Sequence, residues 1–188
     1  LPAEFNEDLI HEKGSIAAAR QGNQINPEMR SSGCQFYIVE GKVYEEPELT
    51  TDLRKLQQAF AQYLQLETNL KLREKYRELY QKGEYDSINS LMLSNKVVLE
   101  KFFNLNLGLD KRKNQVQAYT TVGGTPHLDD TYTVFGKVIK GIDVLDEIAS
   151  LETGSNDLPI TPVYMKVNVE YISKKKIAKE YGYQYPQK

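Results

Sequence analysis

Residues 123–138 read GGTPHLDDTYTVFGKV, and the other predicted elements are arranged around this segment. A Gly-Gly turn and Pro126 precede a β-branched and aromatic run that ends in Phe135 and Gly136. Such a run predicts a loop that leads into a strand whose side chains alternate between two faces. The residues alone indicate a β protein with a histidine, His127, at the rim of a loop.

Two stretches nearer the N-terminus also predict strands. Residues 11–20 read HEKGSIAAAR, and a strand is predicted to follow Gly14 over residues 15–20. Its alanines have small side chains, so one face of this strand presents little side-chain bulk. Residues 31–38 read SSGCQFYI and predict a strand over 35–39 with Phe36 and Ile38 on the face opposite Gln35, Tyr37 and Val39. The polar, turn-prone residues between Gly22 and Gly33 predict a surface loop.

The sequence period changes near Pro47. Apolar residues recur at spacings of three and four from there to Gly83, which predicts one long amphipathic helix. Asp86 or Ser87 then caps a second helix that runs to about Phe103, so the two helices form a hairpin. A shorter helix is expected over residues 110–119.

The C-terminal third predicts one more helix and one more strand. A helix of about two turns follows Gly141, with Asp143 as its cap. Residues 163–172 alternate between apolar and polar side chains, which predicts a closing strand. Residues 174–188, with three consecutive lysines, are expected to form an exposed tail.

Composition excludes several classes of function. A net charge of −2 and a pI near 5.8 give no general attraction to nucleic acid or anionic lipid. The single cysteine, Cys34, cannot form an internal disulfide and is expected to be a small buried group. No apolar run is long enough to span a bilayer, and the first residues, LPAEF, are typical of the middle of a protein rather than of a leader. The compartment stays open between the cytoplasm and the cell envelope.

Three blocks in order, His11–Arg20, Ser31–Ile38 and Thr125–Val138, resemble the cyclophilin family in a bacterial-like form. The resemblance implies a β-barrel of cyclophilin type, of which this chain holds only the later strands, interrupted by an inserted α-helical hairpin. It divides the chain into a partial β domain over residues 1–43 and 118–173, a helical insertion over 44–117 and a tail over 174–188.

The implied activity is peptidyl-prolyl cis-trans isomerisation of X-Pro bonds in protein clients, which assists folding. The barrier to this rotation, about 18–20 kcal/mol, comes from amide resonance, so the reaction needs no nucleophile, metal or cofactor. A catalyst holds the proline ring in an apolar pocket and donates a hydrogen bond to the prolyl nitrogen. Cyclophilins donate it from an arginine. The alternative reading is a non-catalytic proline-peptide-binding or chaperone module.

Seven positions match substrate-binding residues of the family: Ala19, Arg20, Gln35, Tyr37, His127, Leu128 and Tyr132. Arg20 stands where the family usually has asparagine, and Tyr37 takes the place of a pocket phenylalanine. The Phe-His-Arg and Met-x-Gln-Gly-Gly-Asp motifs occur nowhere in the 188 residues. The catalytic arginine is therefore expected upstream of Leu1, and neither Arg20 nor Arg30 takes its role.

Other site types are not favoured. His11 and His127 are the only histidines and have no clustered partner, so no metal site is expected. The adjacent Asp129 and Asp130 are expected to stabilise a turn. The expected partners are proline-containing clients and, through the incomplete barrel, a second copy of the chain.

Overall fold

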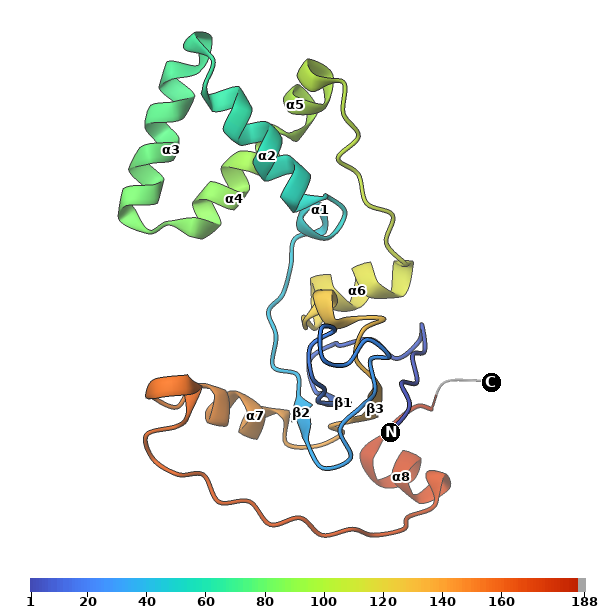
Figure 1. The fold of residues 1–188 in the computed structure, drawn as a ribbon. Coiled ribbons are helices and arrows are strands. Elements are labelled where there is room, and N and C mark those ends of the chain that lie inside the picture. The colour runs from blue at the N-terminus through green and yellow to red at the C-terminus, as the bar shows by residue number, and fades with distance from the viewer. Residues whose placement is uncertain (186–188) are drawn as a thin grey trace. The chain divides into compact units, whose positions relative to one another are not determined.

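The computed structural model describes residues 1–185, which divide into two compact units (Figure 1). The sheet unit comprises residues 1–43 and 122 onward, and the helical unit comprises residues 44–121.

The sheet unit is built on three short antiparallel strands. These are β1 (Ser15–Ala18), β2 (Phe36–Ile38) and β3 (Val134–Lys137), in the order β2-β1-β3. Ala17 pairs with Tyr37 of β2 and with Val134 of β3, and a bulge between Ile16 and Ala17 shifts the second register. The small side chains of β1 suit its central position, where Ala17 is wholly buried.

The Gly-Gly turn has a specific packing partner. Lys42 and Gly124 exchange backbone hydrogen bonds, with N···O distances of 3.2 and 2.9 Å. Gly41 has a positive φ of 65°, and a Cβ there would lie 2.3 Å from the Gly124 Cα. The segment after β2 and the Gly123-Gly124 turn thus approach so closely that only glycine fits at position 41.

The sheet does not close into a barrel within residues 1–185. The predicted closing strand over 163–172 is wrong, because this segment has no regular secondary structure and is largely exposed. Its alternation specifies a face to bury, but a strand also needs a neighbour to receive its backbone hydrogen bonds. Phe36 and Phe135, on the edge strands, remain 50% and 60% exposed.

The remaining elements of the sheet unit are short. They are η2 (Pro126–Leu128), α7 (Ile142–Ala149), η3 (Ser155–Asp157) and α8 (Lys174–Tyr181). The predicted helix after Gly141 is confirmed, although its N-cap is Gly141 and Asp143 lies in the first turn. The expected tail is helical over α8, which Ser173 caps through its hydroxyl group; residues 186–188 of that prediction lie outside the described residues.

The helical unit contains more helices than a hairpin. Its elements are α1 (Glu46–Leu49), α2 (Leu53–Leu64), η1 (Glu67–Asn69), α3 (Leu70–Lys82), α4 (Tyr85–Ser94), α5 (Lys96–Phe103) and α6 (Lys113–Thr121). The prediction that a helix ends at Gly83 is confirmed, since Gly83 adopts the left-handed conformation of a C-cap. The prediction of one continuous helix from Pro47 to Gly83 is wrong. The second predicted helix is divided into α4 and α5, and its N-cap is Glu84 rather than Asp86 or Ser87.

Side-chain hydrogen bonds explain why the helix breaks at the two ends of α2. Asp52 begins α2 by accepting a hydrogen bond from the Lys55 amide. At the other end of α2, the Nε of Arg73 donates to the Leu64 carbonyl at 2.6 Å and Asn69 donates to the Tyr63 carbonyl at 2.8 Å. These donors satisfy carbonyls that a continuing helix would use, so the chain turns back without a glycine or proline.

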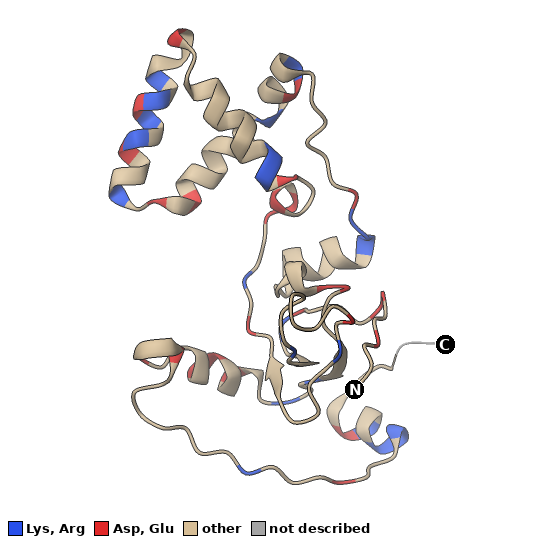
Figure 2. Cartoon of the chain, in the orientation of Figure 1, with Lys and Arg blue, Asp and Glu red and all other residues tan. Residues whose placement is uncertain are grey.

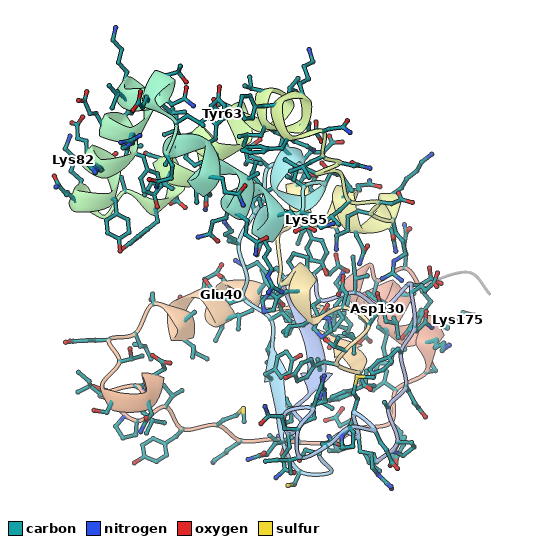
Figure 3. The ribbon with its side chains drawn as sticks, turned by 45° about the horizontal axis from the view of Figure 1, so that its top comes forward. Glu40, Lys55, Tyr63, Lys82, Asp130 and Lys175 are labelled. Carbon is teal, nitrogen blue, oxygen red and sulfur yellow. The ribbon has the colours of Figure 1, made fainter. Side chains whose placement is uncertain are left out.

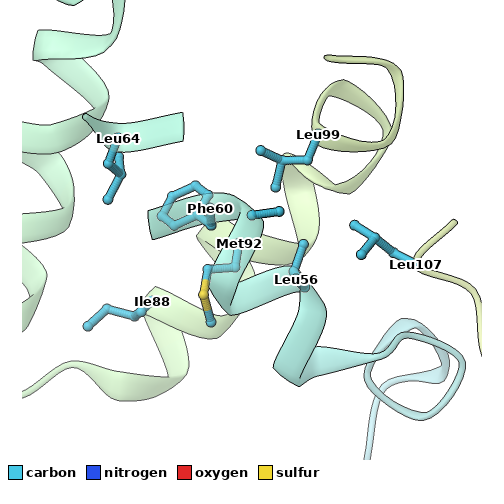
Figure 4. Packing of buried hydrophobic residues seen from close by; sticks show 8 residues of the cluster. Leu56, Phe60, Leu64, Ile88, Met92, Leu99 and Leu107 are labelled. Atoms are coloured by element: carbon cyan, nitrogen blue, oxygen red, sulfur yellow. The ribbon is translucent and has the colours of Figure 1, made fainter. Parts of the chain in front are cut away.

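The core of the helical unit lies between α2, α4 and α5 (Figure 4). Its buried residues are Leu56, Ala59, Phe60, Leu64, Ile88, Met92, Leu99 and Leu107. Tyr63, marked in Figure 3, packs against this core and makes an edge contact with Phe102 at 5.3 Å. Acidic and basic residues alternate along α3, as expected for a solvated helix (Figure 2).

None of the helices in residues 1–185 combines the length and apolarity needed to cross a bilayer.

Candidate functional site

Three aromatic rings meet beside the sheet. Tyr37 lies on β2, Tyr132 precedes β3 and His11 precedes β1, so the order β2-β1-β3 brings them together. The Tyr37 and Tyr132 rings meet edge to face at 5.9 Å, and the His11 ring lies 6.2 Å from Tyr37 and 6.5 Å from Tyr132. The structure thus joins two predicted site residues through a histidine that the sequence did not place there.

His11 fixes the loop that carries the predicted pocket residues. The Asp129 Oδ1 accepts hydrogen bonds from the His11 backbone N–H at 2.8 Å and from the ring Nδ1 at 2.9 Å. The His11 carbonyl accepts from the Thr125 amide at 2.9 Å. His11 is wholly buried, and these hydrogen bonds hold both ends of the segment 125–129, which we call the clamped loop.

The Asp129 carboxylate favours the His11 tautomer that carries a proton on Nδ1. A neutral imidazole that donates from Nδ1 to a carboxylate carries its lone pair on Nε2. That Nε2 is buried without a hydrogen-bond partner in the described chain. The sequence predicted a local turn-stabilising role for Asp129, but its side chain accepts hydrogen bonds from His11, 118 residues away, whereas Asp130 is exposed with a positive φ of 59° (Figure 3).

Tyr37 presents a neutral phenol. Burial raises the pKa of Tyr37 above its usual value, and the nearby Tyr132 raises it further, while the Arg20 charge acts in the opposite direction. Its hydroxyl is buried and lacks a hydrogen-bond partner within residues 1–185. The ring therefore behaves as an apolar wall, which fits the family's phenylalanine at this position.

Arg20 lies against the same cluster. Its guanidinium carbon lies 4.5 Å from the centre of the Tyr132 ring, and its Nε donates to the Thr131 carbonyl at 2.7 Å. Its Nη1 donates to the Gln21 carbonyl and to the Asn23 side chain. These contacts hold the Arg20 guanidinium in one place beside the clamped loop.

Ala19 and Gln35 are joined by their backbones. The Ala19 N–H donates to the Gln35 carbonyl at 3.0 Å, and the Ala19 carbonyl accepts from Ser32 at 2.8 Å. The Ala19 backbone is thus already paired, which limits the peptide docking expected along this strand. The Gln35 side chain is exposed.

His127 and Leu128 lie in η2, on the clamped loop. Leu128 is half-buried, and its carbonyl accepts from the Tyr132 amide at 3.1 Å, which links the two predicted positions. His127 is exposed at the rim of the loop and makes no ring contact with the aromatic cluster in the described structure. The structure therefore gathers Arg20, Tyr37 and Tyr132 closely and leaves His127 apart.

An apolar hollow lies elsewhere on the sheet unit. It has a volume of about 480 Å³, and its lining includes Phe36, Phe135 and Cys34. Because Phe36 and Tyr37 are successive in a strand, this hollow opens on the sheet face away from Tyr37. Cys34 is exposed, so the expectation of a buried thiol was wrong: it precedes β2 in a bend rather than in the core.

No group of three or more histidine, cysteine, aspartate or glutamate side chains within residues 1–185 is arranged to hold a metal ion.

Comparison with known proteins finds relatives of part of this chain. Residues 102–169 match the family model described as cyclophilin type peptidyl-prolyl cis-trans isomerase/CLD. The chain is similar to the cyclophilins. The matched part of this cyclophilin-like chain contains the clamped loop and β3, so it includes His127, Leu128 and Tyr132.

Curated relatives give the same family. A Staphylococcus saprophyticus protein is 49% identical over 45 residues, which are 24% of this chain and 23% of the relative. A Staphylococcus epidermidis protein is 43% identical over 56 residues, or 29% of this chain and 28% of the relative. Both are named as peptidyl-prolyl cis-trans isomerases. The matched segments thus span about a quarter of these relatives.

Proposed function

We propose that this chain is the peptide-binding part of a cyclophilin-type peptidyl-prolyl cis-trans isomerase that acts on X-Pro bonds in protein clients. The observation that carries the proposal is the clamped loop: His11 and Asp129 hold the segment with Leu128 and Tyr132 beside Tyr37. The family match over residues 102–169 supports the reaction class.

The pocket residues have distinct roles in this proposal. Tyr37, Leu128 and Tyr132 hold the proline ring by apolar contact, which keeps the amide away from water and favours rotation. Gln35 and the backbone beside Arg20 position the peptide, since the Ala19 backbone is already paired. His127 contacts the client at the exposed rim.

The catalytic hydrogen-bond donor is not among these residues. Arg20 donates to neutral groups of its own loop and of Thr131, and no arginine of the 188 residues stands in the family's catalytic motif. Without a donor to the prolyl nitrogen, the chain binds prolyl peptides but accelerates their rotation weakly.

The domain boundaries form part of the same proposal. Residues 1–43 and 118–173 belong to the cyclophilin-like β domain, residues 44–117 are an insertion and residues 174–188 are a tail. The limits of the helical unit, residues 44 and 121, support an insertion between two halves of one domain.

We also propose that the open sheet associates with a second copy of the chain. The exposed Phe36 and Phe135 rings, which meet at 6.5 Å, form an apolar face on the two edge strands. Edge strands with unpaired backbone groups pair readily with another chain. Static light scattering should then give a molecular mass greater than that of one chain. Phe135→Lys should shift this mass toward that of the monomer.

A proline-limited refolding assay on the 188-residue chain separates catalysis from binding alone. The proposal predicts slow-phase acceleration well below that of an ordinary cyclophilin, together with binding of an Ala-Pro peptide. Binding without any acceleration would favour the alternative, a non-catalytic peptide-binding or chaperone module. Acceleration at ordinary cyclophilin efficiency would show that the donor lies within this chain.

A further inference from the structure

A polar groove lies beside the candidate site in the sheet unit. It has a volume of about 440 Å³, and its lining includes Arg20, Asn26, Arg30, Ser32 and Gln35. Two arginines line this groove and no acidic residue does. The lining therefore combines positive charge with amide and hydroxyl donors, as in sites that bind carboxylates.

The charge of Arg20 has no acidic partner in the described part of the chain. All of its hydrogen bonds go to neutral acceptors, the carbonyls of Thr131 and Gln21 and the side-chain oxygen of Asn23. These bonds use Nε and Nη1, so Nη2 remains as a donor. A fixed guanidinium with one free edge loses little conformational entropy when it binds an anion.

Arg30 supplies a second charge on a backbone that is also held in place. The Asn26 side chain accepts from the Arg30 N–H at 2.9 Å and donates to the Arg30 carbonyl at 2.8 Å. The Arg30 guanidinium contacts Glu28 at 3.3 Å, but both side chains are well exposed. An exposed pair of this kind is weak, so a client carboxylate can compete for Arg30.

We propose that this groove binds an acidic side chain that flanks the proline of the client. The inference rests on the proposed function for the position of the peptide, because Arg20 and Gln35 line the groove and are also predicted to contact the peptide. The clients are then acidic segments with an exposed X-Pro bond. Arg20 and Arg30, the two charged residues in the lining, give the groove its preference.

Matched fluorescent peptides test the preference on the full chain. Each peptide contains one Ala-Pro bond and carries glutamate, glutamine or lysine at a flanking position, and a parallel set has Ala-Ala in place of Ala-Pro. We expect the glutamate peptide to bind about fivefold more tightly than the glutamine peptide, and lysine to weaken binding, as for a charge-assisted hydrogen bond at a partly exposed site. Salt at about 0.5 M should reduce the preference because it screens such charges.

Charge variants assign the preference to the groove. Arg20→Gln and Arg30→Gln should each reduce the ratio of glutamate to glutamine affinity, whereas Lys140→Gln removes an exposed charge elsewhere in the sheet unit and should leave it unchanged. Glu28→Gln should raise the ratio, because it frees Arg30 from its internal partner.

Equal binding of the glutamate and glutamine peptides, or a preference that survives both arginine substitutions, would overturn this inference. Neither result bears on the proposed function, which instead fails if Ala-Pro and Ala-Ala peptides bind equally. The ratio of glutamate to glutamine affinity is read within the Ala-Pro set, whereas the proline preference is read by comparing the Ala-Pro and Ala-Ala sets, so the two failures are distinct.

Discussion

Removal of the Asp129 carboxylate should loosen the loop that carries the predicted site residues His127 and Leu128. Its Oδ1 accepts two hydrogen bonds from His11, and the two side chains are 0% and 4% exposed, with His11 the less exposed. Asp129→Ala leaves two buried donors without an acceptor. Hydrogen bonds to a charged group contribute roughly 1.5–3 kcal/mol each, and water entry recovers part of that loss, so we expect about 3 kcal/mol.

Native-state hydrogen exchange measures this effect locally. The amides of Leu128 and Tyr132, which are bonded within the loop, should lose protection by about 100-fold, the equivalent of about 3 kcal/mol. Asp129→Asn keeps a neutral acceptor and should lose only about tenfold. Asp146→Ala, which breaks a partly exposed ion pair with Lys13, is the control and should change little. Loop protection that falls less than about threefold in Asp129→Ala would refute the clamp.

Three other substitutions, the last with a control substitution, test separate parts of the structure. Tyr37→Phe should leave the free energy of unfolding at pH 7 almost unchanged, because the lost hydroxyl has no hydrogen-bond partner within residues 1–185. The pKa of Tyr37 is raised in the folded state, so above about pH 10 the phenol loses its proton more readily in the unfolded chain, which favours unfolding. The variant lacks this phenol and should therefore resist alkaline unfolding better than the parent. Gly41→Ala should cost more than about 1 kcal/mol in urea denaturation, because its Cβ would overlap Gly124. Phe60→Ala should cost about 3–5 kcal/mol in the helical unit, followed by circular dichroism, whereas the exposed Val97→Ala should cost under about 1 kcal/mol; equal effects would contradict the packing in Figure 4.

Local signals in the sequence predicted the elements that local chemistry controls. Gly83 follows a run of helical period, and it ends α3 as expected because a left-handed C-cap needs only that one residue. The strands around Ile16, Tyr37 and Phe135 were likewise predicted from alternation. The breaks on either side of α2 were missed because they depend on side chains such as Arg73, which reaches back nine residues to a carbonyl.

Long-range pairing explains the other differences. The alternation over residues 163–172 predicted a strand, but a strand forms only where a neighbour accepts its hydrogen bonds. The pair of His11 and Asp129 was missed for the same reason, because 118 residues separate them and neither residue is unusual in its local sequence. The resemblance placed Tyr37 and Tyr132 in one site; their ring centres lie 5.9 Å apart, and their role in binding a client stays a prediction.

The proposed function depends most directly on where a prolyl peptide binds. An amide chemical-shift titration of the 188-residue chain with an Ala-Pro peptide, and with an Ala-Ala peptide as control, tests this. We predict that the amides of Gln35, Tyr37, Leu128 and Tyr132 shift together with the Ala-Pro peptide and much less with the control. Shifts confined to residues 44–121, or equal shifts with both peptides, would contradict the proposed site.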